Sequence, residues 1–218
     1  MISSILQGGL GNQLFQISAA VSLAADNDDN AVFNIKNHLL PYQGRKCENY
    51  LGNVFRNISF ATDLDFKHLH RENKFEYEKI HYKPNMCLYG YFQSEKYFSK
   101  NADLIRDLVS IDNVSYDIIH DKYNLVLQEN TVSIHIRRGD YLKLGDTHPV
   151  CPYSYYKEAI SFFPKESNFL IFSDDVQWCK ENFKEKHFTF IEGEQDYIDL
   201  YMMSLCEHNI IANSSFSW

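Results

Sequence analysis

Residues 131–141 read TVSIHIRRGDY, an apolar, strand-like run that ends in two adjacent arginines. Further strand-like runs, rich in apolar and aromatic residues, follow at 168–173, 187–191 and 209–213. Helical patterns separate these runs, near 153–163, 175–183 and 195–206. The alternation of strand and helix predicts a parallel sheet with helical crossovers.

The residues that come directly after these strands are rich in charge and in hydroxyl groups. Ligands of parallel sheets bind beyond the carboxyl ends of the strands, so these positions are candidates for a binding site. They are Arg137-Arg138-Gly139-Asp140, Ser173-Asp174-Asp175, Glu192-Gly193 and Ser214-Ser215.

The half of the chain before residue 126 is less regular. Residues 2–6 and 31–35 are expected as strands, and residues 13–25 as an apolar helix after a Gly8–Asn12 turn. The aromatic-rich region 41–125 shows helical pieces near 95–109 and 116–127 and no order that we can assign. We therefore expect two domains, 1–128 and 129–218.

The composition bounds the class of protein. The chain has 218 residues, is 44% apolar and carries a net charge of -8, which argues against a nucleic-acid or anionic-membrane surface. Its five cysteines form no CxxC pair, which fits neither a disulfide framework nor a zinc site. With no signal peptide and no apolar run of about 20 residues, we expect a soluble cytoplasmic protein without a transmembrane segment.

Arg137 and Arg138 are the sharpest local feature. Two arginines at the end of an apolar strand are costly unless an anion meets them, and the guanidinium fork matches the oxygens of a diphosphate. The alternative is a structural pair neutralised by Asp140 or a nearby carboxylate. Because strand alternation sends the two side chains to opposite faces, we expect only one of them to meet a ligand.

Three other motifs have two readings each. Asp174-Asp175 is either a metal-binding pair or a helix N-cap with acidic residues in the first turn. The segment Asn213–Ser217 is either an anion cradle at a helix start or simple capping. Gly8–Gln13 is either a turn or a loop where a ligand approaches the backbone, with Asn12 as a donor. Leu14 stands where a dinucleotide fingerprint needs its third glycine, so an NAD site is not expected.

Taken together, four motifs resemble those of glycosyltransferase family 11, the inverting α-1,2-fucosyltransferases, with bacterial O-antigen and capsule enzymes as the nearest kin. They are GGLGNQLFQ (8–16), HIRRGDY (135–141), FSDD (172–175) and DLYMMSLCEHNIIANSSFSW (199–218). The resemblance implies an α/β, GT-B-like architecture. An N-terminal α/β domain would face the acceptor, and a C-terminal Rossmann-like domain would bind GDP-fucose with no metal or other cofactor.

The resemblance also implies roles for individual residues. Arg137 would grip the donor diphosphate, and Asn12 would face it from a glycine-rich loop that includes Gly9 and Gly11. His135 and Asp175 would contact the guanosine. Three residues would close around phosphate and ribose: Ser214, Ser215 and Phe216. The expected catalytic residues are Arg137, Asn12 and Asp140, with Asp140 or His148 as the candidate general base.

The resemblance implies inverting transfer of L-fucose from GDP-β-L-fucose to the 2-hydroxyl of a galactosyl acceptor. A lipid-linked acceptor would bring the protein to the inner face of the cell membrane as a peripheral protein. In relatives the last motif continues, so we also expect a final helix to be missing after Trp218. The alternatives are a catalytically dead GDP-sugar-binding protein, a metal-dependent GT-A glycosyltransferase using Asp174 and Asp175, and an adhesion module using Arg138-Gly139-Asp140.

Overall fold

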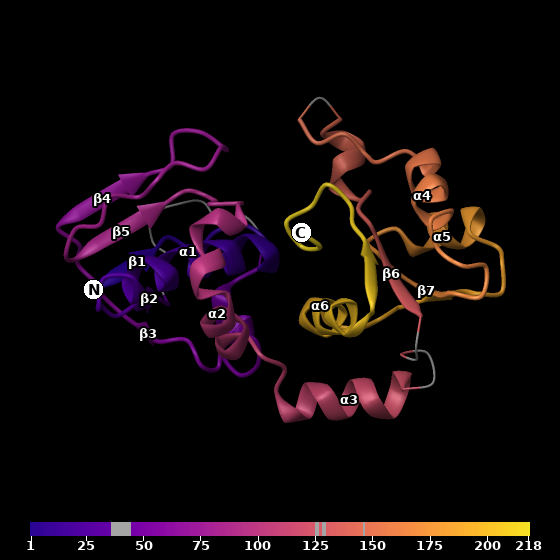
Figure 1. Ribbon diagram of the computed structural model, residues 1–218, viewed down its shortest axis with the longest axis horizontal. Coiled ribbons are helices and arrows are strands. Elements are labelled where there is room, and N and C mark those ends of the chain that lie inside the picture. Colours follow the sequence, from indigo (N-terminus) through magenta and orange to yellow (C-terminus); the bar gives the residue numbers. More distant parts are fainter. Residues whose placement is uncertain (36–44, 125–126, 128–129, 146) are drawn as a thin grey trace. The chain divides into compact units, whose positions relative to one another are not determined.

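The computed structural model describes residues 1–35, 45–124, 127, 130–145 and 147–218. The chain divides into two compact units, Met1–Asp112 and Asn113–Trp218 (Figure 1). The sequence placed this division later, between residues 128 and 129. The difference is helix α3 (Asn113–Tyr123), which belongs to the second unit because its Lys122 and Tyr123 both bond to Glu194, just before helix α6 (Asp196–Leu205).

Parallel strand pairs organise the first unit. One sheet has the order β1 (Ile2–Ser4), β5 (Met86–Tyr89), β4 (His68–Arg71), and a second pairs β2 (Phe33–Asn34) with β3 (Phe60–Ala61). Strands β3, β4 and β5 lie within region 41–125, for which the sequence predicted no strand. The parallel pairing puts the carboxyl ends of β1, β4 and β5 at one edge of their sheet.

Helix α1 (Leu10–Ala25) packs on this sheet with most of its residues buried. Small residues such as Ala19, Ala20 and Ala24 are at most 2% exposed, which lets the helix approach closely. The helix begins three residues earlier than predicted, so Gly11 and Asn12 lie in its first turn rather than in the preceding loop. The unit is completed by α2 (Ala102–Leu108) and by short 3-10 turns at Cys47–Tyr50, Glu95–Tyr97 and Ser99–Asn101.

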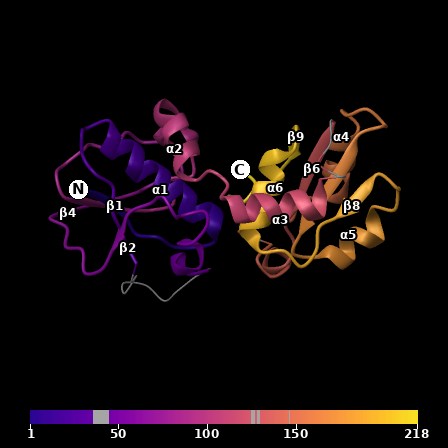
Figure 2. The ribbon, with the colours of Figure 1, turned by 90° about the horizontal axis from the view of Figure 1, so that it is seen from below.

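The second unit confirms the predicted parallel sheet. Its strand order is β8 (Phe188–Phe190), β7 (Asn168–Ser173), β6 (Thr131–Ile136), β9 (His208–Ile210), with every pair parallel. The connecting helices include α4 (Tyr153–Ile160), α5 (Val176–Asn182) and α6, and a 3-10 turn spans Asp140–Lys143. Figure 2 shows α3 running beside α6.

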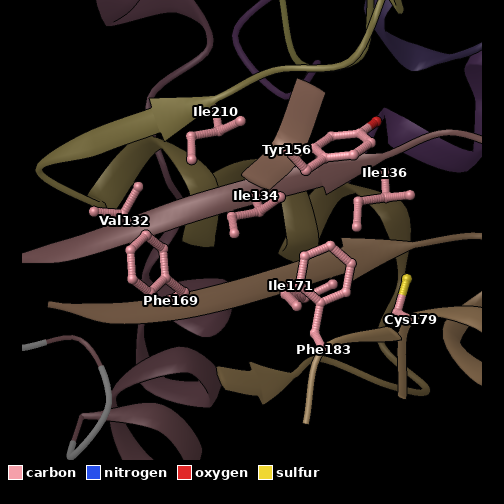
Figure 3. Packing of buried hydrophobic residues seen from close by; sticks show 9 residues of the cluster. All are labelled: Val132, Ile134, Ile136, Tyr156, Phe169, Ile171, Cys179, Phe183 and Ile210. Carbon is pink, nitrogen blue, oxygen red and sulfur yellow. The ribbon is translucent and has the colours of Figure 1, made fainter. Parts of the chain in front are cut away.

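Alternate residues of the central strand β6 form the core of this unit. Val132, Ile134 and Ile136 are fully buried and pack with Phe169 and Ile171 of β7 (Figure 3). Tyr156 from α4 and Cys179 from α5, together with Phe183, Ile210 and the strand residues, complete the cluster. Each fully buried large apolar side chain contributes roughly 1.5–3 kcal/mol to stability. Since β6 alternates, His135 points away from this core. Among the described residues, no helix is both long and apolar enough to cross a lipid bilayer.

Candidate functional site

Arg137 follows β6 directly and is held by two carboxylates. Its Nη2 lies 2.6 Å from Oδ1 of Asp140, and its Nη1 lies 2.8 Å from Oδ2 of Asp174. The guanidinium also lies 5.3 Å from the centroid of the Tyr141 ring. A third of the side chain remains accessible to solvent (33%), so the pairing fixes the guanidinium while leaving part of it open to an anion.

Asp174 connects the carboxyl ends of β6 and β7. Its Oδ1 accepts hydrogen bonds from the backbone N–H groups of Arg138, at 2.9 Å, and Gly139, at 3.2 Å. Its Oδ2 pairs with Arg137. A Cβ atom at Gly139 would lie 2.6 Å from Oδ2 of Asp174, so only glycine leaves room for this carboxylate. Asp174 therefore shapes the turn after β6 and holds Arg137 in one orientation.

The side chain of Arg138 contacts α5 and its N-cap, and so lies on the opposite side of the chain from that of Arg137, as strand alternation predicted. Its Nε donates to Oδ2 of Asp175 at 3.0 Å, and its guanidinium lies 4.0 Å from the centroid of the Trp178 ring. Only 16% of the side chain is exposed. This ion pair is the neutralisation by a nearby carboxylate that the alternative reading of the two arginines expected, and Arg137 is likewise paired with Asp140.

Asp175 is the N-cap of α5. Its Oδ1 accepts from the backbone N–H of Trp178 at 3.2 Å, while Oδ2 holds Arg138. The N-cap reading of the acidic pair is thus confirmed for Asp175. Its expected contact with guanosine stays a prediction.

His135 is buried beneath the last residues of the chain. Its side of β6 faces Ser217, whose Oγ lies 2.8 Å from Nδ1, and Phe216, whose ring centroid lies 5.3 Å from that of the imidazole. Burial lowers the pKa of His135 to about 4, and Arg137 adds to this effect against an opposing contribution from Asp174. The imidazole is therefore neutral at neutral pH.

The segment after β9 folds as a turn and not as the helix start that one reading expected. The carbonyl of Ser214 accepts from the backbone N–H groups of Ser217 and Trp218, both at 3.2 Å, and its Oγ accepts from Phe216. The turn brings Ser214, Ser215 and Phe216 to the edge of the sheet that carries Arg137, where Tyr141 donates to the carbonyl of Asn213.

The two candidate bases, Asp140 and His148, follow Arg137 and Arg138 closely in the sequence. Asp140 already pairs with Arg137, and its side chain is 55% exposed. His148 stacks on Tyr141, with ring centroids 4.9 Å apart. Within the described part of the chain, no three His, Cys, Asp or Glu side chains gather into a group suited to a metal ion.

The predicted loop residues of the first unit surround the start of α1. Gly9 is the N-cap of this helix, and Gly11 lies in its first turn with Asn12. Gly8 has a φ of +78°, and a Cβ there would lie 2.3 Å from Nδ2 of Asn12. Oδ1 of Asn12 accepts from Nε2 of Gln93 at 2.7 Å.

The structure therefore gathers His135, Arg137, Asp140, Asp175 and the 214–216 segment at one edge of the second unit's sheet. Asn12, Gly9 and Gly11 lie at the carboxyl edge of a sheet in the first unit. Sequence reasoning gave no role to three residues that complete these clusters: Tyr141, Trp178 and Gln93. Asp174 was a candidate because it follows a strand, but its bonds to Arg137 and to the turn after β6 were not predicted.

Comparisons with known proteins identify the family. The sequence profile described as glycosyl transferase family 11 matches residues 55–218, most of the chain. The chain belongs to glycosyltransferase family 11. An Escherichia coli "Alpha-1,2-colitosyltransferase" is 30% identical over 245 aligned positions, covering 98% of this chain and 84% of the relative. The E. coli "O-antigen biosynthesis glycosyltransferase WbnK" is 34% identical over 265 positions, covering 99% and 87%.

Solved structures give the same fold. The fucosyltransferase NodZ from Bradyrhizobium matches with a TM-score of 0.65 at 12% identity, covering 99% of this chain and 91% of that one. A NodZ α-1,6-fucosyltransferase co-crystallised with GDP matches with a TM-score of 0.63. This family 11 chain is an α/β, GT-B-like protein of the fucosyltransferase type, as the motifs predicted.

Two alternatives are overturned by these findings. The GT-B-like fold contradicts the GT-A enzyme that would have used Asp174 and Asp175, and both carboxylates instead hold arginines. The adhesion reading of Arg138-Gly139-Asp140 is wrong as well. In this family 11 glycosyltransferase, Asp174 and Asp175 hold Arg138 and Gly139, and Asp140 pairs with Arg137.

Proposed function

We propose that this family 11 protein transfers L-fucose from GDP-β-L-fucose to the 2-hydroxyl of a galactosyl acceptor, with inversion at the anomeric carbon. The observation that carries the proposal is Arg137, partly open and fixed by two carboxylates at the carboxyl edge of a parallel sheet. A relative named for α-1,2 transfer supports the linkage. The NodZ crystals soaked with GDP-fucose or grown with GDP support the donor.

The proposed chemistry is a single displacement. The acceptor hydroxyl attacks the anomeric carbon opposite the departing GDP, so the new bond forms as the carbon–oxygen bond to the diphosphate breaks. Negative charge grows on that diphosphate in the oxocarbenium-like transition state. Donors fixed in advance stabilise this charge more than they stabilise the ground state. Arg137, Asn12 and the turn at Ser214–Phe216 are the proposed donors, and they would supply positive potential without a metal.

The carboxylates around Arg137 would do two things. Asp174 holds Nη1 from the protein side, which pre-orients the guanidinium before the donor arrives. Asp140 pairs with Nη2 near solvent, where an incoming diphosphate could replace it. A displaced Asp140 would be available to accept the proton of the acceptor hydroxyl, which makes it our candidate general base ahead of His148.

The proposed nucleoside contacts come from His135, Asp175 and Phe216. His135 is neutral because it is buried beneath Phe216 and Ser217, so the proposed contact requires these residues to move aside. The imidazole would then offer hydrogen bonds and a ring edge rather than charge to the guanosine. Cytoplasmic location and association with the membrane through a lipid-linked acceptor belong to the same proposal.

A second donor is specifically favoured by one relative. The E. coli protein named for colitosyl transfer is similar over 98% of this chain. Colitose is L-fucose without its 3-hydroxyl, so a donor pocket for one accepts the other unless a polar group demands that hydroxyl. GDP-colitose is therefore the alternative donor within the same reaction.

A donor screen tests the proposal. We expect GDP, GDP-fucose or GDP-colitose to raise the melting temperature, and UDP and UDP-galactose to leave it unchanged, because a ligand that binds only the native state stabilises it by mass action. Galactosides incubated with GDP-fucose should gain one deoxyhexose by mass spectrometry, with and without EDTA. Equal shifts with UDP and GDP would exclude the donor assignment. Activity lost in EDTA and restored by Mn²⁺ would contradict a metal-free reaction, and GDP binding without turnover would indicate a dead sugar-binding protein.

A further inference from the structure

Gln93 lies in the loop that follows β5, and its side chain reaches the first turn of α1. Nε2 of Gln93 donates to Oδ1 of Asn12 at 2.7 Å, although the two residues are 81 positions apart in the sequence. The bond takes up the carbonyl oxygen of the Asn12 amide. The amide nitrogen of Asn12 lies over Gly8, where a Cβ would come within 2.3 Å of it. The Asn12 amide is thus held in one of its two orientations.

The loop that carries Gln93 is built with a strained backbone. Phe92 has a φ of +51°, a conformation that side-chain-bearing residues rarely adopt, and it is completely buried. Its ring packs edge-on against Tyr97, with centroids 5.4 Å apart, and stacks near His70. Such strain persists only where the surroundings over-determine it, and it concentrates at functional sites.

Glu72, at the carboxyl end of β4, holds this loop in place. Its carboxylate accepts from the backbone N–H of Tyr91 at 2.6 Å and from that of Phe92 at 3.1 Å. A Cβ at Gly90 would lie 2.4 Å from Cβ and 2.6 Å from Oε2 of Glu72, so glycine is needed where this side chain passes. Nε2 of Gln16, within α1, donates to the carbonyl of Gly90 at 3.1 Å. The loop is therefore fixed to both β4 and α1.

We propose that Gln93 is a positioning residue, which turns the amide nitrogen of Asn12 toward the diphosphate of the donor. The inference rests on the proposed function, because it needs Asn12 to act on that diphosphate. Glu72 and the strained backbone at Phe92 fix the loop that carries Gln93, and the bond from Gln93 fixes the Asn12 amide. Together these contacts set the direction of a single N–H donor. A misdirected carbonyl oxygen at this point would repel the charge that grows on the leaving group.

Two substitutions of Gln93 test the inference, because they should lower kcat by different amounts. Gln93→Leu removes the donor and lets the Asn12 amide rotate, so kcat should fall roughly ten- to a hundredfold. Gln93→Glu keeps the shape of the side chain but offers only acceptor oxygens. The Asn12 amide should therefore flip, so that its nitrogen faces Glu and its oxygen faces the donor. We expect kcat to fall further than in Gln93→Leu. The melting temperature should change little, since Gln93 is exposed. The control is Gln177→Leu, which removes another exposed glutamine bond, of 2.8 Å to Glu181, and should leave kcat unchanged.

A double-mutant cycle with Asn12→Ala decides whether Gln93 acts through Asn12. Once the Asn12 amide is gone, Gln93→Leu should cost nothing more, so the two effects should be strongly non-additive. Additive effects, or an unchanged kcat in both Gln93 variants, would overturn the inference. The cycle uses whichever donor the screen finds, so it does not depend on fucose. If the wild-type chain turns over no donor, the proposed function fails. The double-mutant cycle is then measured on the Kd of GDP, where we expect the same non-additivity.

Discussion

Arg137 and Arg138 are neighbours in the chain with different surroundings. Arg138 lies between the ring of Trp178 and the carboxylate of Asp175, with 16% of its side chain exposed. Arg137 lies among Asp140, Asp174 and Tyr141, with twice that exposed fraction, 33%. An arginine that packs on a ring and a helix cap serves the fold. An arginine with a third of its side chain open to solvent can serve a ligand.

Alanine substitutions should separate the two roles. Arg137→Ala should leave the melting temperature nearly unchanged and lower the rate of sugar transfer by roughly 10²–10³. Arg138→Ala should destabilise the protein by about 1–3 kcal/mol, because it leaves the Asp175 carboxylate without its partner and uncovers Trp178. Paired melting curves and transfer kinetics measure both. Near-normal turnover in Arg137→Ala would exclude the diphosphate role, and lost turnover in a stable Arg138→Ala would reverse the assignment.

His135 makes stability depend on pH. Its pKa is about 4 in the folded protein and about 6.5 when unfolded, so between these values the unfolded chain binds a proton that the folded chain does not. The contribution of His135 to stability is complete above pH 6.5 and is lost as the pH falls toward 4, in total on the order of 3 kcal/mol. Unfolding free energies of wild type and His135→Gln, measured from pH 7 to 4, check this. The slope should be shallower in the variant, and equal slopes would contradict it.

Several contacts at the residue scale had no signal in the sequence. Ser217 meets His135 across 82 positions, and Gln93 meets Asn12 across 81. A propensity or a periodicity reports on neighbours in the chain and is blind to such pairs. The sequence supplied Arg137 with Asp140 as a possible partner, and the resemblance supplied Asn12, but neither identified Gln93 as the residue that holds Asn12.

Among the elements, the strands of the second unit were predicted, whereas β3, β4 and β5 of the first unit were missed, although β5 reads MCLY, a mostly buried apolar run. Strand β6 reads TVSIHI and is buried along its length, which is typical of a central parallel strand. Strand β4 reads HLHR and lies mostly exposed at the edge of its sheet, so it has neither the apolar run nor the alternation that would identify it. The start of α1 was misplaced because Gly11 and Asn12 favour turns, while burial in the structure overrides that preference.

The turn after β6 offers a prediction at the scale of an element. Gly139→Ala would place a Cβ 2.6 Å from Oδ2 of Asp174, so the carboxylate has to move away from Arg137. We expect transfer to fall at least tenfold while the fold persists, because the buried strand itself is untouched. Kinetics and melting curves test this against Gly145→Ala, where a Cβ meets nothing within 4 Å. Equal activity in the two variants would show that Asp174 does not orient Arg137.

At the scale of the whole molecule, the chain is two units with separate cores. The second unit packs around Val132, Ile134 and Ile136, and the first around α1 and residues such as Phe33 and Leu88. The proposed guanosine and diphosphate contacts of the second unit all come from the sequence range 135–216. The proposed contribution of the first unit to the donor is a smaller one, through Asn12.

This division predicts how the separate units bind nucleotide. A chain of residues 113–218 should fold and bind GDP, because it contains all four strands of the sheet that the structure describes in this unit, together with His135, Arg137 and the turn at 214–216. Its affinity should be weaker than that of the whole chain by roughly tenfold, about the 1.4 kcal/mol that the loss of one directed donor such as Asn12 represents. Residues 1–112 alone should bind no GDP. Titration calorimetry on both pieces, with Arg137→Ala in 113–218 as the control, measures this. If 113–218 folds by circular dichroism yet binds no GDP, the donor site needs more than the edge of this sheet, and our assignment of the nucleotide to the second unit is wrong.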